Sequence, residues 1–133
     1  MMTLVDTSVW IEFFKPRPVV DLNPLELLIE ERNVVTCHPV KAEILSGEMS
    51  TSTREVVTGA LESMISVDPD WNAPATWKNI VSLATKARQK GIGVPGLVDR
   101  MILMAAVESG AILWTLDKKL KKFALIFGVA LMT

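Results

Sequence analysis

The sequence predicts an α/β fold, a three-layer α/β/α sandwich with a central, mostly parallel sheet. Short apolar segments alternate with helical segments along the chain, which is typical of a parallel sheet covered on both faces. The chain has 133 residues, the length of one domain, so we assign residues 1–133 to a single domain. Half of the residues are hydrophobic and the mean hydropathy is +0.34, so we also expect apolar surface buried against a partner.

The chain begins with a strand and a helix that are separated by an acid. Residues 2–5 are apolar and predict a strand that ends at Asp6. Thr7 or Ser8 can cap the following helix, which continues through residue 14. Asp6 is therefore expected at the carboxyl end of the first strand.

Two helices and a second strand follow. Residues 23–32 begin with an Asn-Pro pair and an early acid, the pattern of a helix start. Residues 34–37 are apolar and predict a strand. A short helix that starts at Pro39 carries Glu43, and Gly47 is placed to end it.

The middle of the chain predicts two more helices joined by an extended segment. A Ser/Thr cluster caps a helix over residues 50–65, and a proline opens a longer one over residues 74–90 that Gly91 ends. Residues 67–71, between these helices, are expected to be extended.

The last third contains the most apolar helix of the chain. In the helix predicted at residues 97–109, apolar residues occupy almost the whole circumference, so we expect this helix to be buried. Asp99 interrupts its apolar surface. Gly110 ends this helix, and residues 111–114 form a strand with Asp117 just past its end. A basic helix at 118–123 and a final strand at 129–132 complete the prediction.

The net charge of −1 conceals an asymmetry between the two halves of the chain. Residues 1–70 carry five Lys/Arg and twelve Asp/Glu, whereas residues 71–133 carry nine and three. The balances of −7 and +6 favour a polyanionic partner for the basic half, although ordinary solvated helix faces explain them as well.

The sequence predicts a cytoplasmic protein with no membrane association. No apolar stretch approaches the roughly 20 residues of a membrane span, and the first residues lack the basic region of a signal peptide. The only cysteine, Cys37, cannot form an internal disulfide and is expected in the core. The only histidine, His38, is expected to have a capping or core role.

Four acids form a candidate functional site. Asp6 and Asp117 follow strands, and ligands bind at the carboxyl ends of the strands of such sheets. Simpler roles exist, because Asp6 could cap a helix and Glu43 and Asp117 could be solvated. Asp99 could pair with Arg100 or a lysine. A carboxylate in an apolar helix costs stability unless a cation neutralises it, so we interpret the four acids as one cation site.

The chemistry of these ligands favours a hard cation. Carboxylate oxygens suit Mg²⁺, with Mn²⁺ as a possible substitute, rather than zinc. With one His and no Tyr, the chain lacks a pair of histidines that could act as acid and base without a metal. A bound cation can lower the pKa of water and stabilise charge that develops on a substrate.

Three segments, LVDTSVWIEFF, VKAEIL and VDRMILMAAVESGAILWTLDKKLKKF, resemble in sequence and order the PIN-domain family, particularly its VapC-type toxins. The resemblance covers essentially the whole chain. It implies an Mg²⁺-dependent endoribonuclease that is the toxin of a type II toxin–antitoxin pair, with an RNA substrate, a cognate antitoxin and a homodimeric state. By the same resemblance, the catalytic and metal-binding residues are Asp6, Glu43, Asp99 and Asp117, supported by the polar residues Thr7, Ser8 and Thr115.

The sequence departs from the family pattern at one position. Many relatives carry another acid two positions beyond the one that matches Asp117, and here that position is Lys119. We therefore expect a single well-ordered Mg²⁺ between Asp6 and Asp99. The expected RNA contacts are the basic residues near the last two acids in sequence, Arg88, Lys90, Arg100, Lys118, Lys119, Lys121 and Lys122.

Two other functions remain open. A catalytically silent PIN-like interaction module would carry the same fold, and the four acids do not exclude it. A phosphoryl-transfer enzyme with Asp6 as nucleophile usually has a second acid two residues on, where this chain has Ser8.

Overall fold

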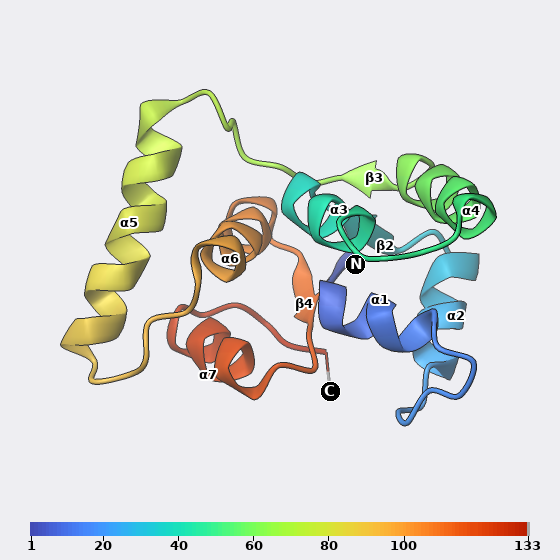
Figure 1. Ribbon diagram of the computed structural model, residues 1–133. Helices are drawn as coiled ribbons and strands as arrows, with labels where there is room; N and C mark the ends of the chain where they lie inside the picture. Colours follow the sequence, from blue (N-terminus) through green and yellow to red (C-terminus); the bar gives the residue numbers. More distant parts are fainter. Residues whose placement is uncertain (133) are drawn as a thin grey trace.

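A computed structural model describes residues 1–132 and contains a four-stranded sheet in the order β3-β2-β1-β4 (Figure 1). The strands are β1 (Thr3–Val5), β2 (Val34–Thr36), β3 (Ile65–Ser66) and β4 (Ile112–Trp114). All three pairings are parallel, and Leu131 adds an isolated parallel bridge to Leu113 of β4. The predicted α/β fold with a parallel sheet is confirmed.

Helices cover both faces of this sheet. They are α1 (Thr7–Phe13), α2 (Asn23–Glu30), α3 (His38–Leu45), α4 (Thr51–Glu62), α5 (Pro74–Gln89), α6 (Leu97–Ser109) and α7 (Lys118–Ile126). The chain moves from β1 to β2 to β3 in one direction and then returns past β1 to β4. Because parallel crossovers are right-handed, this reversal sends the later helices to the opposite face. Figure 1 shows α6 and α7 on one side of β4, with α1, α2 and α4 on the other.

The reversal creates the position where a ligand is expected in such a sheet. β1 lies between β2 and β4, so the chain leaves β1 toward one edge and later returns on its other side. Ligands bind at the carboxyl ends of strands at this kind of switch point. The Asp6 amide donates to the Trp114 carbonyl at 2.8 Å, which joins the ends of β1 and β4 there.

The core is formed by the elements with the strongest apolar patterns. The middle of α6, from Ile102 to Ala106, is buried without interruption, as the sequence predicted. Cys37 is fully buried, which confirms its expected place in the core. Gly110 ends α6 with a φ of 70°, a left-handed conformation that glycine adopts without strain.

Several boundaries differ from the prediction. The helix predicted to residue 65 ends at Glu62, and the short strand β3 follows at Ile65–Ser66, where Ile65 pairs with Val35 of β2. The segment expected to be extended, residues 67–71, comes after this strand. In place of the strand expected at residues 129–132, the structure has only an isolated bridge between Leu131 and Leu113. Such pairings are made between distant segments, so local sequence patterns do not fix their limits.

The helix starts also differ, because polar side chains near them have other partners. Asp6, not Thr7 or Ser8, holds the N-cap position of α1, since the two hydroxyls bond to Glu43 and Asp6. At α2 the N-cap residue is Leu22. Within the described residues, no helix combines the length and the apolar character that a membrane crossing requires.

Candidate active site

Asp6 is the buried centre of the site. It follows β1 directly, and its residue is only 4% exposed. Its side chain makes no capping bond to α1, although it holds the N-cap position. Its Oδ2 instead accepts hydrogen bonds from the Thr115 hydroxyl at 2.7 Å and the Ser8 hydroxyl at 2.9 Å. The carboxylate is therefore held in one orientation by two neutral donors that leave its charge uncompensated.

The same hydroxyls connect the loops that follow β1 and β4. Ser8 Oγ accepts from the Leu116 amide at 3.0 Å and lies 3.3 Å from Thr115 Oγ1. Thr115 Oγ1 accepts from the Asp117 amide at 3.1 Å. Through this network, residues more than one hundred positions apart fix one another. The structure thus places the predicted supporting residues Ser8 and Thr115 directly against Asp6.

The helix acids reach the site by different means. Glu43 on α3 is exposed, and its Oε1 accepts from the Thr7 hydroxyl at 2.7 Å. Asp117 caps α7, and its Oδ1 accepts from the amides of Lys119 at 2.8 Å and Leu120 at 3.3 Å. Asp117 therefore caps its helix through its side chain, whereas the side-chain cap considered for Asp6 on α1 is not formed.

Asp99, in the first turn of α6, shows that the four acids act on one another. Burial and the negative charges of Asp6, Asp117 and Glu43 together raise the pKa of Asp99 to about 6, against a smaller opposite effect of Lys119. The structure therefore brings all four predicted acids into one electrostatic site.

Arg100 does not neutralise Asp99. Its guanidinium donates to the carbonyls of Pro95 and Ile80, both at 3.1 Å, and so links α6 to α5 and the preceding loop. The ion pair of Asp99 with Arg100, considered from the sequence, is wrong. The salt bridges within residues 1–132 are Lys15–Glu12 and His38–Asp68, and neither includes an acid of the site.

These residues fit a divalent cation of the hard class. The ligands offered are carboxylate oxygens, and their mutual repulsion is relieved by a positive charge. Among residues 1–132, no three His, Cys, Asp or Glu side chains are grouped closely enough to form a ready-made metal centre. A divalent ion shared by these acids would therefore require them to draw closer together. A single Mg²⁺ between Asp6 and Asp99 stays a prediction.

The predicted RNA contacts are divided among α5, α6 and α7, and Arg100 of α6 is half-buried with its guanidinium bonded to backbone carbonyls. Three lysines of α7 are exposed beside Asp117 and a fourth is half-buried, whereas Arg88 and Lys90 are exposed at the end of α5. The lysines of α7 are Lys118, Lys119, Lys121 and Lys122. The Lys119 side chain lies against Gly93, where an added Cβ would be 3.0 Å from its Cε. Lys119 thus lies between the end of α5 and the acidic site.

Asp68 is a charged residue at this edge that the sequence did not predict. It follows β3 as Asp6 follows β1, and its Oδ2 lies 2.6 Å from Nδ1 of His38. The position after a strand could have revealed it, but the strand was expected two residues later. His38 is exposed and in contact with an acid, so the expected core role is wrong.

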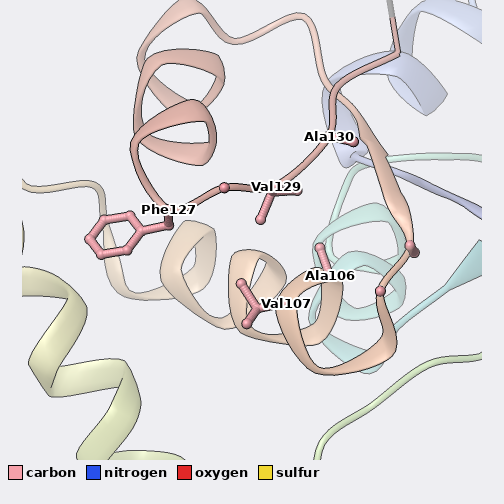
Figure 2. A pocket seen from close by; sticks show the side chains of 8 residues that line it. Ala106, Val107, Phe127, Val129 and Ala130 are labelled. Carbon is pink, nitrogen blue, oxygen red and sulfur yellow. The ribbon is translucent and has the colours of Figure 1, made fainter.

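A cavity of about 200 Å³ lies elsewhere in the molecule. Figure 2 shows Ala106 and Val107 of α6 facing Val129 and Ala130 of the C-terminal segment, with Phe127 beside them. The cavity also contacts residues 110–111, which precede β4, so it lies at the edge of the sheet opposite the acids. It has no part in the site.

Comparison with known proteins agrees with this arrangement. A family model described as the PIN domain matches residues 3–125. A protein named ribonuclease VapC32 from Mycobacterium tuberculosis is 36% identical over 132 residues, which are 98% of this chain and 96% of that protein.

Solved structures show the same fold. VapBC2 from Rickettsia felis, bound to a DNA fragment from its promoter, gives a TM-score of 0.72 at 22% identity, with 99% of this chain and 98% of that chain covered. VapBC-1 from nontypeable Haemophilus influenzae gives 0.71 at 18% identity, with 99% and 97% covered. The family model spans most of the chain, and the relative from M. tuberculosis aligns along nearly all of it. The chain therefore belongs to the PIN-domain family.

Proposed function

We propose that this protein is a metal-dependent endoribonuclease and the toxin of a type II toxin–antitoxin pair. The observation that carries the proposal is the buried Asp6 carboxylate, which only neutral hydroxyls contact and which shares its surroundings with Asp99, Asp117 and Glu43, whose charges help to raise the pKa of Asp99. Such an arrangement is unfavourable without a cation. The relatives named as ribonucleases support RNA as the substrate.

Each acid has a distinct part in this function. Asp6 and Asp99 hold the cation, with Glu43 and Asp117 completing the set from α3 and the start of α7. Ser8 and Thr115 fix the Asp6 carboxylate, and Thr7 fixes Glu43, so that these ligands face the substrate in one orientation. When bound, Mg²⁺ supplies a nucleophile from water at neutral pH and stabilises the charge of the phosphate. Lysines of α7 bind neighbouring phosphates of the RNA.

The first prediction is that RNA cleavage requires a divalent cation. Purified protein should cleave single-stranded RNA with Mg²⁺ or Mn²⁺ and lose cleavage in EDTA, because no second histidine is available for metal-free chemistry. Activity is measured on labelled oligonucleotides before and after the metal is restored. Asp6→Asn, purified in the same way, controls for contaminating nucleases.

Cleavage that persists in EDTA and in Asp6→Asn would contradict the proposal. Mg²⁺ binding by calorimetry without any cleavage would instead indicate the silent interaction module.

An apolar groove supports the antitoxin as partner. A groove of about 590 Å³ lies between α1, α2, α4 and β3, and its lining includes Trp10, Phe13, Phe14, Met64 and Ile65. Phe14 is 42% exposed and Ile65 is 56% exposed, although both are apolar. The similar structures are VapBC assemblies, which supports an antitoxin as the molecule that covers this groove.

The groove and the acids are connected by α1. This helix begins next to Asp6 and ends at Phe13 in the groove, and its seven residues span about 10 Å. A partner chain seated in the groove can therefore extend along α1 and place an Arg or Lys against the acids. Such a contact neutralises the site and blocks it at the same time.

The second prediction concerns this contact. Neutralising both Asp6 and Asp99 (Asp6→Asn with Asp99→Asn) should weaken binding of the antitoxin, because its cation loses its partners. Binding of the product of the adjacent small reading frame is measured by calorimetry. Glu48→Gln with Glu108→Gln, two exposed acids outside the site, is the matched control. Equal affinity for both double variants would show that the partner avoids the acids.

A homodimer is also part of the proposal. Trp77 and Val81 of α5, with Leu97 and Val98 at the start of α6, are apolar and at least 36% exposed, and the two helices pack against each other. A second copy would cover this surface. Sedimentation should then give twice the mass of the 14.7 kDa chain.

A further inference from the structure

The single histidine of the chain, His38, is held beside the acidic site by the largely buried carboxylate of Asp68. His38 is the first residue of α3, and Asp68 lies just beyond β3. The His38 backbone amide donates to Asp68 Oδ1 at 2.9 Å, and ring Nδ1 lies 2.6 Å from Oδ2. The His38 side chain remains 67% exposed, while that of Asp68 is 13% exposed. The ring is therefore fixed at one nitrogen and open to solvent at the other.

The surroundings of Asp68 keep it ionised and in place. Burial acts to raise the pKa of Asp68, but hydrogen bonds from the His38 amide, the Ser66 hydroxyl, the His38 ring and the Trp71 indole outweigh it and lower the pKa. Ser66 Oγ donates at 2.7 Å and Trp71 Nε1 at 2.9 Å. A carboxylate held in this way selects the ring form that carries a proton on Nδ1. Nε2 then points outward, and it donates once the ring is charged.

This pair lies in the same row as the acidic site. The strand order places the residues that follow β3, β2, β1 and β4 side by side along one edge of the sheet, and these are Asp68, His38, Asp6 and Asp117. Neighbouring strands are about 4.8 Å apart. Glu43 lies five residues beyond His38 on α3, about 7.5 Å along the helix axis.

Cys37 confirms that the two clusters are close. Burial and, to a smaller extent, the charges of Asp68, Asp6 and Glu43 together raise the pKa of this thiol to about 12. Both clusters therefore lie within electrostatic reach of one buried atom.

A capping role explains only part of this geometry. The bond from the His38 amide to Asp68 satisfies one free amide at the start of α3, and a single carboxylate oxygen is enough for that. The second oxygen holds the ring. The lysines of α7 lie on the Asp117 side of the site, whereas residues 1–70 have an excess of seven negative charges. A cation on the α3 side would stabilise a chain of phosphates that crosses the acids. His38 lies there with an exposed side chain, whereas Lys41, further along α3, is half-buried.

We propose that His38 is an RNA-binding residue that donates from Nε2 to a backbone phosphate on the side of the acidic site opposite α7, and that Asp68 is the residue that positions it. This inference rests on the proposed ribonuclease function. Asp68 on Nδ1 and a phosphate on Nε2 both stabilise the charged imidazole. The contact binds substrate and leaves the cleavage step to the acids.

Variants separate this role from simple electrostatics. His38→Gln should raise two quantities by about three- to tenfold, the effect of an exposed charged hydrogen bond. These are the KM measured with Mg²⁺ and the Kd for a fluorescein-labelled RNA oligonucleotide measured in EDTA, while kcat with Mg²⁺ should change little. His38→Arg should restore most of the affinity. Asp68→Asn should weaken RNA binding although it removes a negative charge. Asp70→Asn, the same change at an exposed acid two residues on, should bind RNA equally or more tightly.

A spectroscopic test needs no variant, because the chain has one histidine. In EDTA, imidazole ¹⁵N spectra of the parent should show the Nε2 resonance shifting when the RNA is added, while the Nδ1 resonance, which reports the contact with Asp68, changes little. A ring spectrum that does not change at saturating RNA, together with an unchanged KM for His38→Gln, would overturn the role of His38 and leave the ribonuclease function intact. A parent that neither binds nor cleaves RNA would overturn both.

Discussion

Replacing Asp99 by Asn should raise the melting temperature of the metal-free protein and remove most of the stabilisation that Mg²⁺ gives the parent. Asparagine keeps the shape of the side chain and removes one of four clustered charges. The pKa of Asp99 is raised to about 6, so its ionised form at pH 7.5 destabilises the fold. After a discount for partial exposure we expect a gain of about 1 kcal/mol and about 3 °C. RNA cleavage should fall by roughly two orders of magnitude or more.

The dependence on pH has a definite sign. The folded-state pKa of about 6 lies above the unfolded value of about 3.9, so the folded state binds more protons between these values. The contribution of Asp99 to stability is therefore lost as pH rises through this window. The advantage of Asp99→Asn over the parent should grow from about pH 4 to about pH 6 and stay constant above it.

Thermal melts of the parent and Asp99→Asn, each in EDTA and in Mg²⁺, measure these effects. If Asp99 were instead a structural ion-pair partner, removing its charge would cost roughly 3–5 kcal/mol in the metal-free protein. A clear fall of the metal-free melting temperature with a full Mg²⁺ shift would remove Asp99 from the site.

Thr115→Val should destabilise the protein and impair cleavage, whereas Thr36→Val should do neither. Thr115 is 1% exposed, and its hydroxyl donates to Asp6 and accepts from the Asp117 amide. Its removal leaves the Asp117 amide without this partner and leaves Asp6 Oδ2 with the Ser8 hydroxyl alone, at a cost of about 1–3 kcal/mol. Loss of a group that orients a metal ligand typically lowers metal affinity or activity by about 10- to 100-fold.

Thr36 is a matched control at the end of β2, which lies on the other side of β1 from β4. It is fully buried, and its hydroxyl has no hydrogen-bond partner within residues 1–132. Valine has the same shape without the hydroxyl, so we expect unchanged or higher stability. Urea denaturation and kcat/KM are measured for both variants. Thr115→Ser, which keeps the hydroxyl, should retain most of the activity. Equal behaviour of Thr115→Val and Thr36→Val would show that the hydroxyl network has no role in holding Asp6.

Much of the fold could be predicted from the sequence because its signals are local. The apolar pattern of α6, the proline that opens α5 and the glycine that ends α6 each act within a few residues. The limits of β3 and of the C-terminal bridge could not be predicted. They depend on pairing with Val35 and Leu113, which are distant in the chain.

The candidate site divides in the same way. Asp6, Glu43, Asp99 and Asp117 were identified from their positions after strands and on helices, and the resemblance to the PIN-domain family named the same residues. The sequence could not show which acid caps a helix, because that depends on the backbone at each helix start. The sequence also left open whether Asp99 pairs with Arg100. The packing of α6 on α5 excludes this pair, because it directs the Arg100 guanidinium to the carbonyls of Ile80 and Pro95.

By itself, the sequence determined the order of the elements, the buried character of α6 and the identity of the acids, because periodicity and residue type are properties of short segments. Only the tertiary structure decided how the acids are held. Thr115 reaches Asp6 across 109 positions, and Asp68 reaches His38 across 30, because the parallel sheet brings the ends of β1 and β4, and of β2 and β3, together. No local pattern carries such information, since the contact forms only when distant strands become neighbours.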